Sequence, residues 1–325
     1  KLVLLLSRLD MMTATYAPSR SGSLAEADLY GSSAVYRTIE FNNMQPIHVR
    51  GNKRTNVDGL PTGLSWFTSQ IAGHKTEVKK GIQQLGFLKD EKIPSCVLKP
   101  VMKDKRGQIE KTFYERVFKS RNSELSNFRQ LIPHYFHTRD IVYNGEDFEL
   151  LEMEDTTSLV SLPATMDVKI GRFTFNPTAS AEKQLREREK YPLQEVQGFR
   201  VLGYHIKRAD GSVDKLDRET CLALSKEELA NEMKSFFASR SLEDRPILAA
   251  QLLEQLAPVR RAMSAGVVNI YSSSLLFVLE TDTMEKPRAI VKMVDFSHVY
   301  EANGEPDENY LFGLDNIIAL LKTLL

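Results

Sequence analysis

An acid and a lysine two positions apart are the residues of this sequence best suited to chemistry. Asp167 and Lys169 stand in the run PATMDVKIG, residues 163–171. Because alternate residues of a strand project to the same face, a strand here would point a carboxylate and an ammonium group into one space. Such a pair suits holding a hydroxyl group and a phosphate together. A half-exposed ion pair on a strand is the alternative that the spacing leaves open.

A second acid follows an apolar run near the C-terminus. Residues 291–298 read VKMVDFSH, so Asp295 ends the run and Phe296 comes next. In phosphoryl-transfer enzymes an Asp at such a strand end holds Mg²⁺ against the nucleotide phosphates. Two residues alone, Asp-Phe, are a weak indication of such a site. His298 can equally be a structural histidine.

A lysine ends the first clear β-type run of the chain, residues 95–99. From there Lys99 could reach nucleotide phosphates, with Glu110 or Glu115 of the next helix as its partner. A solvated lysine is the alternative. A Walker-type loop is not supported, because the glycine spacing GxxxxG at Gly81 to Gly86 is followed by Phe87 where a phosphate-binding lysine is required.

A cationic stripe comes shortly after the Asp167 and Lys169 segment. Residues 177–192 predict a helix that begins at Pro177 and is stopped by Pro192. At about 100° per residue, Lys183, Arg186 and Lys190 fall on one side of it. Neighbouring glutamates make a solvated charged face plausible. The position favours a site for a polyanionic substrate.

Composition excludes several other classes of protein. The 325 residues carry 43 Lys+Arg and 43 Asp+Glu. This balance gives no global charge for nucleic acid or an anionic membrane, so we expect no nucleic-acid partner. Cys96 and Cys221 lie far apart and predict neither a zinc ribbon nor a disulfide framework, which favours a reducing compartment. No apolar run approaches the ~18 residues of a spanning helix, so we expect no transmembrane or secretory segment, and the start at Lys1 suggests a trimmed N-terminus.

Metal and hydrolase sites are poorly supported. His134 and His137 have a spacing that could serve a metal, but aromatic neighbours and the lack of a nearby third ligand favour packing. No Gly-x-Ser-x-Gly motif and no Cys/His nucleophile motif is present.

The pattern of elements predicts two lobes after a leader. Residues 1–62 are rich in Ser, Gly, Asn, Thr and Pro and predict a partly disordered leader. Residues 63–156 carry a strand, a helix and a hairpin turning at Asn144-Gly145, the order of a small nucleotide-clamping lobe. Residues 157–325 carry strands at 198–206, 274–280 and 288–294. Helices are predicted from the capping box at Ser225 and over 247–257 and 314–325.

With these residues in view, the chain resembles the inositol polyphosphate kinase family. The family signature Pro-x-x-x-Asp-x-Lys-x-Gly is complete at Pro163, Asp167, Lys169 and Gly171. Two further blocks match in order: YSSSLLFV at 271–278, and DFSH at 295–298 followed by NYLFGLDN at 309–316. The similarity runs from about Gln70 to the C-terminus and does not include the leader.

Within the family, the chain is most similar to the inositol phosphate multikinase branch, on residues 183–192 and 198–203. The His298 that follows Asp-Phe-Ser differs from the trisphosphate 3-kinase branch, where Gly-Lys is usual after Asp-Phe. Hexakisphosphate kinases usually have Asp-Leu-Lys in the signature. Arg186 and Glu187 depart from the glutamines that multikinases often have, so the trisphosphate 3-kinase and hexakisphosphate kinase alternatives stay open.

The resemblance implies an α+β, two-lobed kinase-like fold. It consists of a small antiparallel β N-lobe over residues 63–156 and a larger α+β C-lobe over residues 157–325. An inositol-binding helical segment is inserted in the C-lobe at about residues 176–196. ATP would bind between the lobes.

The resemblance also implies roles for individual residues. The backbone of Glu154 to Thr156 would contact adenine, and Lys99 would hold the α- and β-phosphates. Asp295 would bind Mg²⁺, with help from Ser274. Asp167 would lie near the ribose and the reacting hydroxyl, as both a catalytic and an ATP-binding residue. The expected substrate-binding set is Lys169, which would bridge the transferred group and the acceptor, with Lys183, Arg186, Lys190 and His298.

The implied activity is transfer of the γ-phosphoryl group of Mg-ATP to hydroxyls of soluble inositol tris- and tetrakisphosphates. Two alternatives remain, a kinase acting on phosphatidylinositol bisphosphate and a non-catalytic inositol phosphate receptor. Phosphoinositide headgroups are therefore a second class of partner. We expect a location in the cytoplasm, the nucleus or both, and the sequence does not indicate an oligomeric state.

Overall fold

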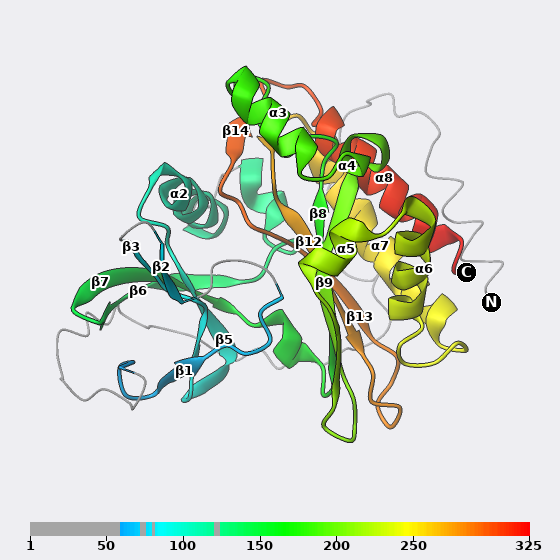
Figure 1. Cartoon of the computed structure of the whole chain (residues 1–325), viewed down its shortest axis with the longest axis horizontal. Coiled ribbons are helices and arrows are strands. Elements are labelled where there is room, and N and C mark those ends of the chain that lie inside the picture. Colours follow the sequence, from blue (N-terminus) through cyan, green and yellow to red (C-terminus); the bar gives the residue numbers. More distant parts are fainter. Residues whose placement is uncertain (1–58, 72–75, 80–81, 120–123) are drawn as a thin grey trace, which may run out of the picture. The chain divides into compact units, whose positions relative to one another are not determined.

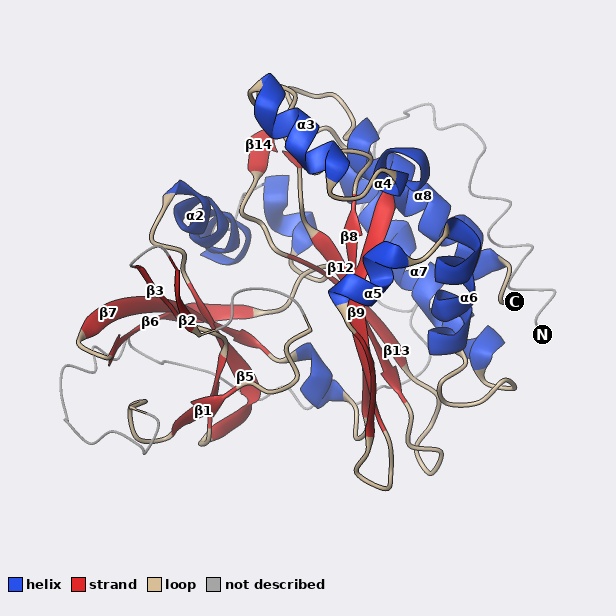
Figure 2. Cartoon of the chain, viewed as in Figure 1, coloured by secondary structure: helices blue, strands red, loops and turns tan. Residues whose placement is uncertain are grey.

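The computed structural model describes residues 59–71, 76–79, 82–119 and 124–325, all within the compact unit Gln45–Leu325. Nearly all of the predicted leader, residues 1–62, therefore lies outside the described residues. The described part contains two five-stranded antiparallel sheets and the helices that cover them (Figures 1 and 2). This arrangement confirms the α+β prediction.

The first sheet is built from strands on the N-terminal side of residue 155. Its order is β1-β4-β5-β7-β6, with β1 Leu64–Trp66, β4 Leu88–Asp90, β5 Ile93–Pro100, β7 Glu146–Glu154 and β6 Tyr135–Tyr143. Strands β2 (Glu77–Lys79) and β3 (Ile82–Gln84) form a separate ribbon. The β6–β7 hairpin turns at Asn144 and Gly145 with φ of 49° and 80°. These left-handed values confirm the turn that the Asn-Gly pair predicted.

The two faces of the first sheet have different environments. Leu98 and Leu150 belong to a small core on one face, against which Trp66 packs. Helix α2 (Lys105–Lys119) buries four residues whose spacing puts them on one face, Glu110, Phe113, Tyr114 and Val117. The three apolar ones join the main core of the protein. A short 3₁₀ helix, Glu124–Phe128, follows α2.

The second sheet carries the Asp167 and Lys169 segment at its centre. Its order is β10-β9-β8-β12-β13, with β10 Val213–Leu216, β9 Phe199–Lys207, β8 Pro163–Ile170, β12 Ser274–Glu280 and β13 Ala289–Val294. Another 3₁₀ helix, Thr156–Leu159, joins the two sheets. Strands β11 (Val268–Ile270) and β14 (Val299–Glu301) form a second ribbon.

Three helices follow the predicted pattern, with differences at their ends. Helix α6 (Lys226–Phe237) begins with the predicted capping box at Ser225. Helix α7 (Arg245–Ser264) continues through Pro258 instead of ending near residue 257, because its long buried face offsets the hydrogen bond that proline cannot donate. Helix α8 (Glu308–Lys322) begins six residues earlier than predicted, where the Asp307 carboxylate accepts from the amide of Tyr310 at 2.9 Å.

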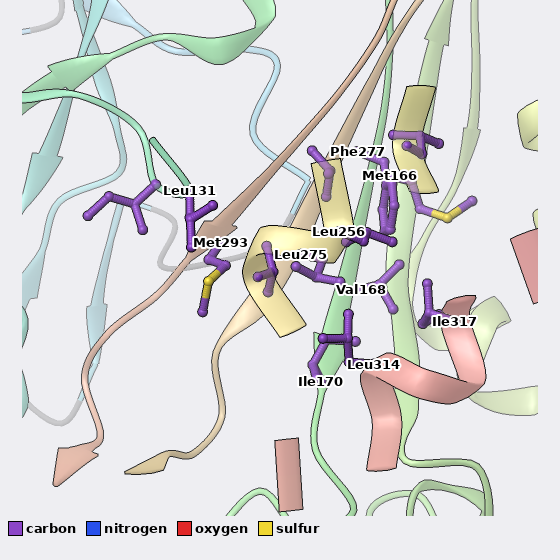
Figure 3. Packing of buried hydrophobic residues seen from close by; sticks show 14 of the residues in the cluster. Leu131, Met166, Val168, Ile170, Leu256, Leu275, Phe277, Met293, Leu314 and Ile317 are labelled. Atoms are coloured by element: carbon purple, nitrogen blue, oxygen red, sulfur yellow. The ribbon is translucent and has the colours of Figure 1, made fainter. Parts of the chain in front are cut away.

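The main core lies on one face of the second sheet. Figure 3 shows Val168 of β8 and Leu275 of β12 pointing toward Leu256 of α7, with Leu314 of α8 close by. Because side chains alternate along a strand, the residues on either side of Val168 face away from this core. Among the described residues no helix is both long and apolar enough to cross a membrane.

Candidate active site

Both sheets contribute side chains to a cavity of about 500 Å³. The cavity wall includes seven of the predicted catalytic and binding residues, namely Lys99, Glu154, Thr156, Asp167, Lys169, Asp295 and His298, and it also includes Glu110. Four predicted residues are not part of this wall: Lys183, Arg186, Lys190 and Ser274.

Lys99 is held by two carboxylates. Its Nζ lies 2.7 Å from Oε1 of Glu110 and 2.6 Å from Oδ1 of Asp295. The structure thus selects Glu110 as the partner, whereas Glu115 pairs with Lys119 on the same helix at 2.8 Å. Burial acts to lower the pKa of Lys99, but the two carboxylates raise it well above its ordinary value. Lys99 therefore carries a positive charge in the cavity at physiological pH.

Asp295 is fixed by the aromatic residue that follows it. Phe296 packs against Phe113 at a ring-centroid distance of 4.4 Å and against Tyr114 at 5.5 Å. The amide of Phe296 donates to Oε1 of Glu110 at 3.0 Å. Asp295 has a φ of 66°, a left-handed backbone that is uncommon outside glycine and often marks functional sites. The Asp-Phe pair thus combines an anchored ring with a carboxylate directed at Lys99.

Asp167 is a buried acid with a raised pKa. Only 7% of its surface is exposed, and its Oδ1 has no hydrogen-bond partner in the described part of the chain. Burial and the carboxylate of Asp295 raise the pKa of Asp167 to about 6, although the hydroxyl of Ser274 and two nearby lysines act in the opposite direction. Two mutually repelling carboxylates at one cavity fit a hard divalent cation such as Mg²⁺, whose remaining ligands are commonly water and phosphate oxygens.

Ser274, which we expected to help Asp295 bind Mg²⁺, is not part of the cavity wall. It is the first residue of β12, pairs in register with Lys169, and is fully buried. Its hydroxyl acts on the pKa of Asp167 instead. Contact between Ser274 and a metal ion therefore stays a prediction. The full burial of Ser274 does not favour it.

Lys169 is held on the wall by the loop before β12. Its Nζ donates to the carbonyl oxygen of Ser272 at 2.6 Å and to the Ser272 hydroxyl at 2.9 Å. Ser272 has a φ of 60°, the second left-handed non-glycine residue at the cavity. Burial lowers the pKa of Lys169, against the effect of the nearby carboxylates of Asp295 and Asp167. The loop therefore orients an ammonium group beside Asp167.

The segment after β7 forms the other end of the cavity. The amide of Glu154 donates to the His134 carbonyl and the amide of Asp155 to the Ser95 carbonyl, both at 2.8 Å. These two amides are engaged, so a base bound here could not accept from them. The hydroxyl of Thr156 is buried without a hydrogen-bond partner among the described residues. This hydroxyl is therefore one polar group at the cavity that is available to a ligand.

Apolar side chains also line the cavity. Val97 of β5, Met153 of β7 and Leu276 of β12 all contribute to the wall. Apolar surfaces with few polar groups are typical of sites for flat organic ligands such as nucleotide bases.

The inserted segment, residues 176–196, contains two short helices instead of the single predicted one. Helix α3 (Ala181–Glu189) begins after Ser180, whose hydroxyl accepts from the amide of Lys183 at 3.3 Å, so the predicted start at Pro177 is wrong. The residues before it form a turn around the side chain of Asn176. Helix α3 ends before Pro192, and Pro192 itself comes directly before the second helix, α4 (Leu193–Gln197).

The cations of the inserted segment differ in their relation to the site. Burial and the charges of Lys183, Arg106 and Lys169 lower the pKa of His298, so the charge of Lys183 acts on this part of the cavity although Lys183 is not part of the wall. Lys190 pairs with Glu187 of its own segment at 2.5 Å. Arg186 is exposed and lies off the wall.

Three arginines near the site were not anticipated. Arg106, at the start of α2, contributes to the cavity wall. Arg200 on β9 is buried, and Arg218 begins helix α5 (Arg218–Ala223); both lower the pKa of Lys169. A charged residue inside the apolar run of β9 was the available signal for Arg200. The sequence offers no comparable signal for Arg106 and Arg218, which the fold brings in from separate elements.

Amide side chains hold both ends of the inserted segment. Asn309 of α8 accepts from the amide of Phe173 at 2.7 Å and donates to the Phe173 carbonyl at 3.1 Å. At the far end, Asn316 donates to the carbonyl of Gln197 at 2.9 Å. Helix α8 therefore sets where the cations of α3 lie.

The two histidines considered as metal ligands are packed separately. The ring of His134 lies 4.8 Å from the rings of both Phe118 and Phe136. His137 has its Nε2 3.4 Å from Glu152. The described ranges contain no cluster of three or more His, Cys, Asp or Glu side chains that could hold a metal.

The comparison with protein families matches one family model over more than half of the chain. The family model described as "Inositol polyphosphate kinase" matches residues 150–322, a range that includes Asp167, Lys169 and Asp295. Among solved structures, the inositol phosphate multikinase of S. cerevisiae in complex with ADP and Mn²⁺ shares the fold. Its TM-score is 0.58 and its identity 20%, over 70% of this chain and 98% of that one. This likeness confirms the kinase-like two-lobed architecture.

The curated relatives carry the name of one branch. Inositol polyphosphate multikinase beta of Arabidopsis thaliana is 28% identical over 79% of this chain and 92% of that protein. The multikinase of Rattus norvegicus is 32% identical over 69% of this chain, which spans only 56% of that relative. These names confirm the predicted similarity to the multikinase branch. The chain belongs to the inositol polyphosphate kinase family.

Proposed function

We propose that this protein transfers the γ-phosphoryl group of Mg-ATP to hydroxyl groups of inositol tris- and tetrakisphosphates, in the manner of a multikinase. One observation carries the proposal: Lys99, Asp167, Lys169 and Asp295 come from distant parts of the chain and meet at one cavity. Phosphoryl transfer depends chiefly on positioning the reactants and neutralising charge. Two acids and two lysines at one cavity supply both.

The nucleotide fits the end of the cavity near residue 156. The apolar side chains of Val97, Met153 and Leu276 would cover the base, and the hydroxyl of Thr156 would gain a partner. Lys99 would hold phosphate oxygens. Asp295 would hold Mg²⁺, which neutralises charge on the phosphates when bound, and Asp167 would remain free to receive a proton. A solved multikinase of S. cerevisiae binds ADP and Mn²⁺, which supports this assignment.

The acceptor fits the side of the cavity that carries positive charge. Lys169, Arg106 and His298 contribute to the wall, and Lys183 acts on His298 from α3. Phosphates of an inositol ring would bind to these groups through charge-assisted hydrogen bonds. Asp167, with a pKa of about 6, is ionised at neutral pH and can accept the proton of the attacking hydroxyl.

A second candidate substrate is an inositol lipid headgroup. Leu185 on α3 and Val196 on α4 are 58% and 62% exposed, beside the cations of the inserted segment. Exposed apolar and basic residues together suit contact with an anionic membrane, which would present the same phosphorylated ring. Phosphatidylinositol bisphosphate is therefore the alternative acceptor. A non-catalytic receptor is less well supported, because ligand binding alone does not require the paired acids.

The two cysteines support a proposal for where in the cell the protein is found. Cys96 and Cys221 are both buried and free. This state is in keeping with a reducing compartment, so we propose the cytoplasm, the nucleus or both.

The test is a turnover assay with Mg-ATP and a panel of inositol tris-, tetrakis-, pentakis- and hexakisphosphates, with products separated by anion-exchange chromatography. We expect successive conversion of trisphosphate to pentakisphosphate. One product from one substrate would instead indicate a trisphosphate 3-kinase or a hexakisphosphate kinase. Turnover only on vesicles containing phosphatidylinositol bisphosphate would indicate the lipid kinase, and ATP binding without any turnover would indicate the receptor.

A further inference from the structure

Arg200 is a buried cation without a counterion in contact. Only 4% of its surface is exposed, and its Nε has no hydrogen-bond partner within the ranges that the structure describes. None of the ion pairs found in those ranges involves it. Burying an arginine without a partner is costly, so such residues are rare unless they serve binding or catalysis.

The strand register places Arg200 on the same side of the sheet as Lys169. In the antiparallel pair of β8 and β9, Arg200 lies opposite Lys169 and Val201 lies opposite Val168. Both valines belong to the main hydrophobic core. Because side chains alternate, Arg200 and Lys169 face away from the core, toward the side where Lys169 meets the cavity.

Other charges reinforce the positive character of this place. Arg218, at the start of α5, acts electrostatically on both Arg200 and Lys169. Burial and Arg218 lower the pKa of Arg200 to about 10, so the guanidinium is still charged at neutral pH. Glu187 of α3 and Asp167 also act on Arg200 electrostatically, but Glu187 is already engaged, with Lys190 at 2.5 Å and Thr174 at 3.4 Å. Among the described residues, no acid therefore neutralises the positive charge of Arg200 by direct contact.

We propose that Arg200 forms an inner anion subsite next to Lys169 that binds a phosphate group of the inositol acceptor. The inference rests on the proposed function and deepens it. A planar guanidinium binds a phosphate through two parallel hydrogen bonds, which Lys169 alone cannot do. An acceptor bearing a phosphate at this position would bind and be oriented, and one lacking it would be a poor substrate. Arg200 is thus a specificity-determining residue.

The test compares the wild type with Arg200→Met and Arg200→Lys. For each, we would measure kcat and KM for inositol trisphosphate and for ATP, the Kd for inositol trisphosphate by calorimetry, and the thermal midpoint. In Arg200→Met we expect KM and Kd for the acceptor to rise about 10- to 100-fold, as for loss of a charge-assisted hydrogen bond, with KM for ATP unchanged. Arg200→Lys should recover only part of the affinity.

Thermal stability separates this role from a structural one. Removal of an unpaired buried charge should leave the thermal midpoint of Arg200→Met equal to or above that of the wild type. A lower midpoint together with higher KM for both substrates would show that Arg200 supports the fold, and would overturn the inference. The matched control is Arg208→Met, an arginine just beyond the end of β9 that pairs with Asp214 at 2.7 Å; it should leave the acceptor KM unchanged.

The outcomes also separate this inference from the proposed function. An active wild type whose acceptor KM is unaffected by Arg200→Met would overturn the subsite alone. A wild type that binds inositol trisphosphate without turnover would refute the kinase, while a raised Kd in Arg200→Met would still support the subsite. A wild type that neither binds nor phosphorylates inositol trisphosphate would overturn both.

Discussion

The Nζ of Lys99 lies 2.6 Å from Oδ1 of Asp295, although 196 positions separate the two residues in the sequence. Lys99 comes from β5 of the first sheet, and Asp295 follows β13 of the second. This pair therefore joins the two halves of the cavity. With Mg-ATP bound, Lys99 would hold phosphate oxygens and Asp295 would hold the cation. The ion pair between them keeps both groups in place beforehand.

Glu110 should control this pair. Its Oε1 accepts from both Lys99 and the amide of Phe296. In Glu110→Gln we expect kcat to fall roughly 10- to 100-fold and KM for ATP to rise, because the charge that holds Lys99 is lost. Steady-state kinetics with varied ATP measure both. Glu115→Gln is the matched control, since its ion pair with Lys119 is exposed and worth less than about 1 kcal/mol; equal effects of the two variants would refute the role of Glu110.

Asp167 should titrate near pH 6 in the free protein. Burial and the neighbouring Asp295 raise its pKa to about 6. Carboxyl ¹³C NMR should show a midpoint there that is missing in Asp167→Asn and moves to lower pH in Asp295→Asn. kcat/KM should fall as pH drops below about 6, because protonated Asp167 cannot accept a proton. A midpoint near 4 in the wild type, or one unchanged by Asp295→Asn, would contradict the coupling of the two acids.

The same raised pKa makes ionised Asp167 a source of instability. Between the ordinary pKa of an unfolded Asp and about 6, the folded state binds more protons than the unfolded state, so stability falls as pH rises through this window. Asp167→Asn should therefore increase the free energy of unfolding at pH 7.5, by up to ~3 kcal/mol, with little difference near pH 4.

Urea denaturation at the two pH values measures this effect. The control is Asp147→Asn, which removes an exposed carboxylate of the β6–β7 hairpin and should change stability little at either pH. A less stable Asp167→Asn at pH 7.5 would mean that the favourable interactions of the carboxylate exceed the cost of burying it.

Much of this site could be predicted from local patterns. The strand that carries Asp167 and Lys169 was recognisable because apolar residues alternate with the functional ones, and β8 has this alternation. The helix that carries Glu110 was also predicted, and Phe296 was recognised from the Asp-Phe motif that contains it. Such features depend on neighbours in sequence, which a pattern can capture.

Features that depend on distant contacts could not be predicted in this way. The sequence left Glu110 and Glu115 equal as partners of Lys99, because only the docking of Phe296 against α2 distinguishes them. The start of α3 was misjudged because two local signals compete, a proline at 177 and a capping hydroxyl at Ser180. Arg200 became notable only when its burial and its register with Lys169 were known.

Asn309 should act as a positioning residue for the acceptor. Its amide makes two hydrogen bonds to the backbone of Phe173, ahead of the inserted segment. In Asn309→Ala we expect KM for the inositol phosphate to rise about 5- to 10-fold, from the loss of two hydrogen bonds of ~1 kcal/mol each at most, with KM for ATP unchanged. Asn309→Asp keeps the acceptor atom and should show a smaller effect.

Asn231→Ala on the exposed side of α6 is the control for Asn309. It should leave both KM values as in the wild type. Equal increases in KM for ATP and for the acceptor in Asn309→Ala would indicate a general loss of structure instead of positioning.

The most direct test of the account is transfer of label from [γ-³²P]ATP to inositol trisphosphate by the wild type and by Lys169→Met, with ATP binding measured in parallel by calorimetry. Lys169 lies beside Asp167 at the acceptor side of the cavity, held by Ser272. We predict labelled inositol tetrakis- and pentakisphosphates from the wild type. In Lys169→Met, transfer should fall at least about 100-fold while the Kd for ATP stays within about threefold. Equal transfer by the two proteins, or label released only as inorganic phosphate, would contradict the account.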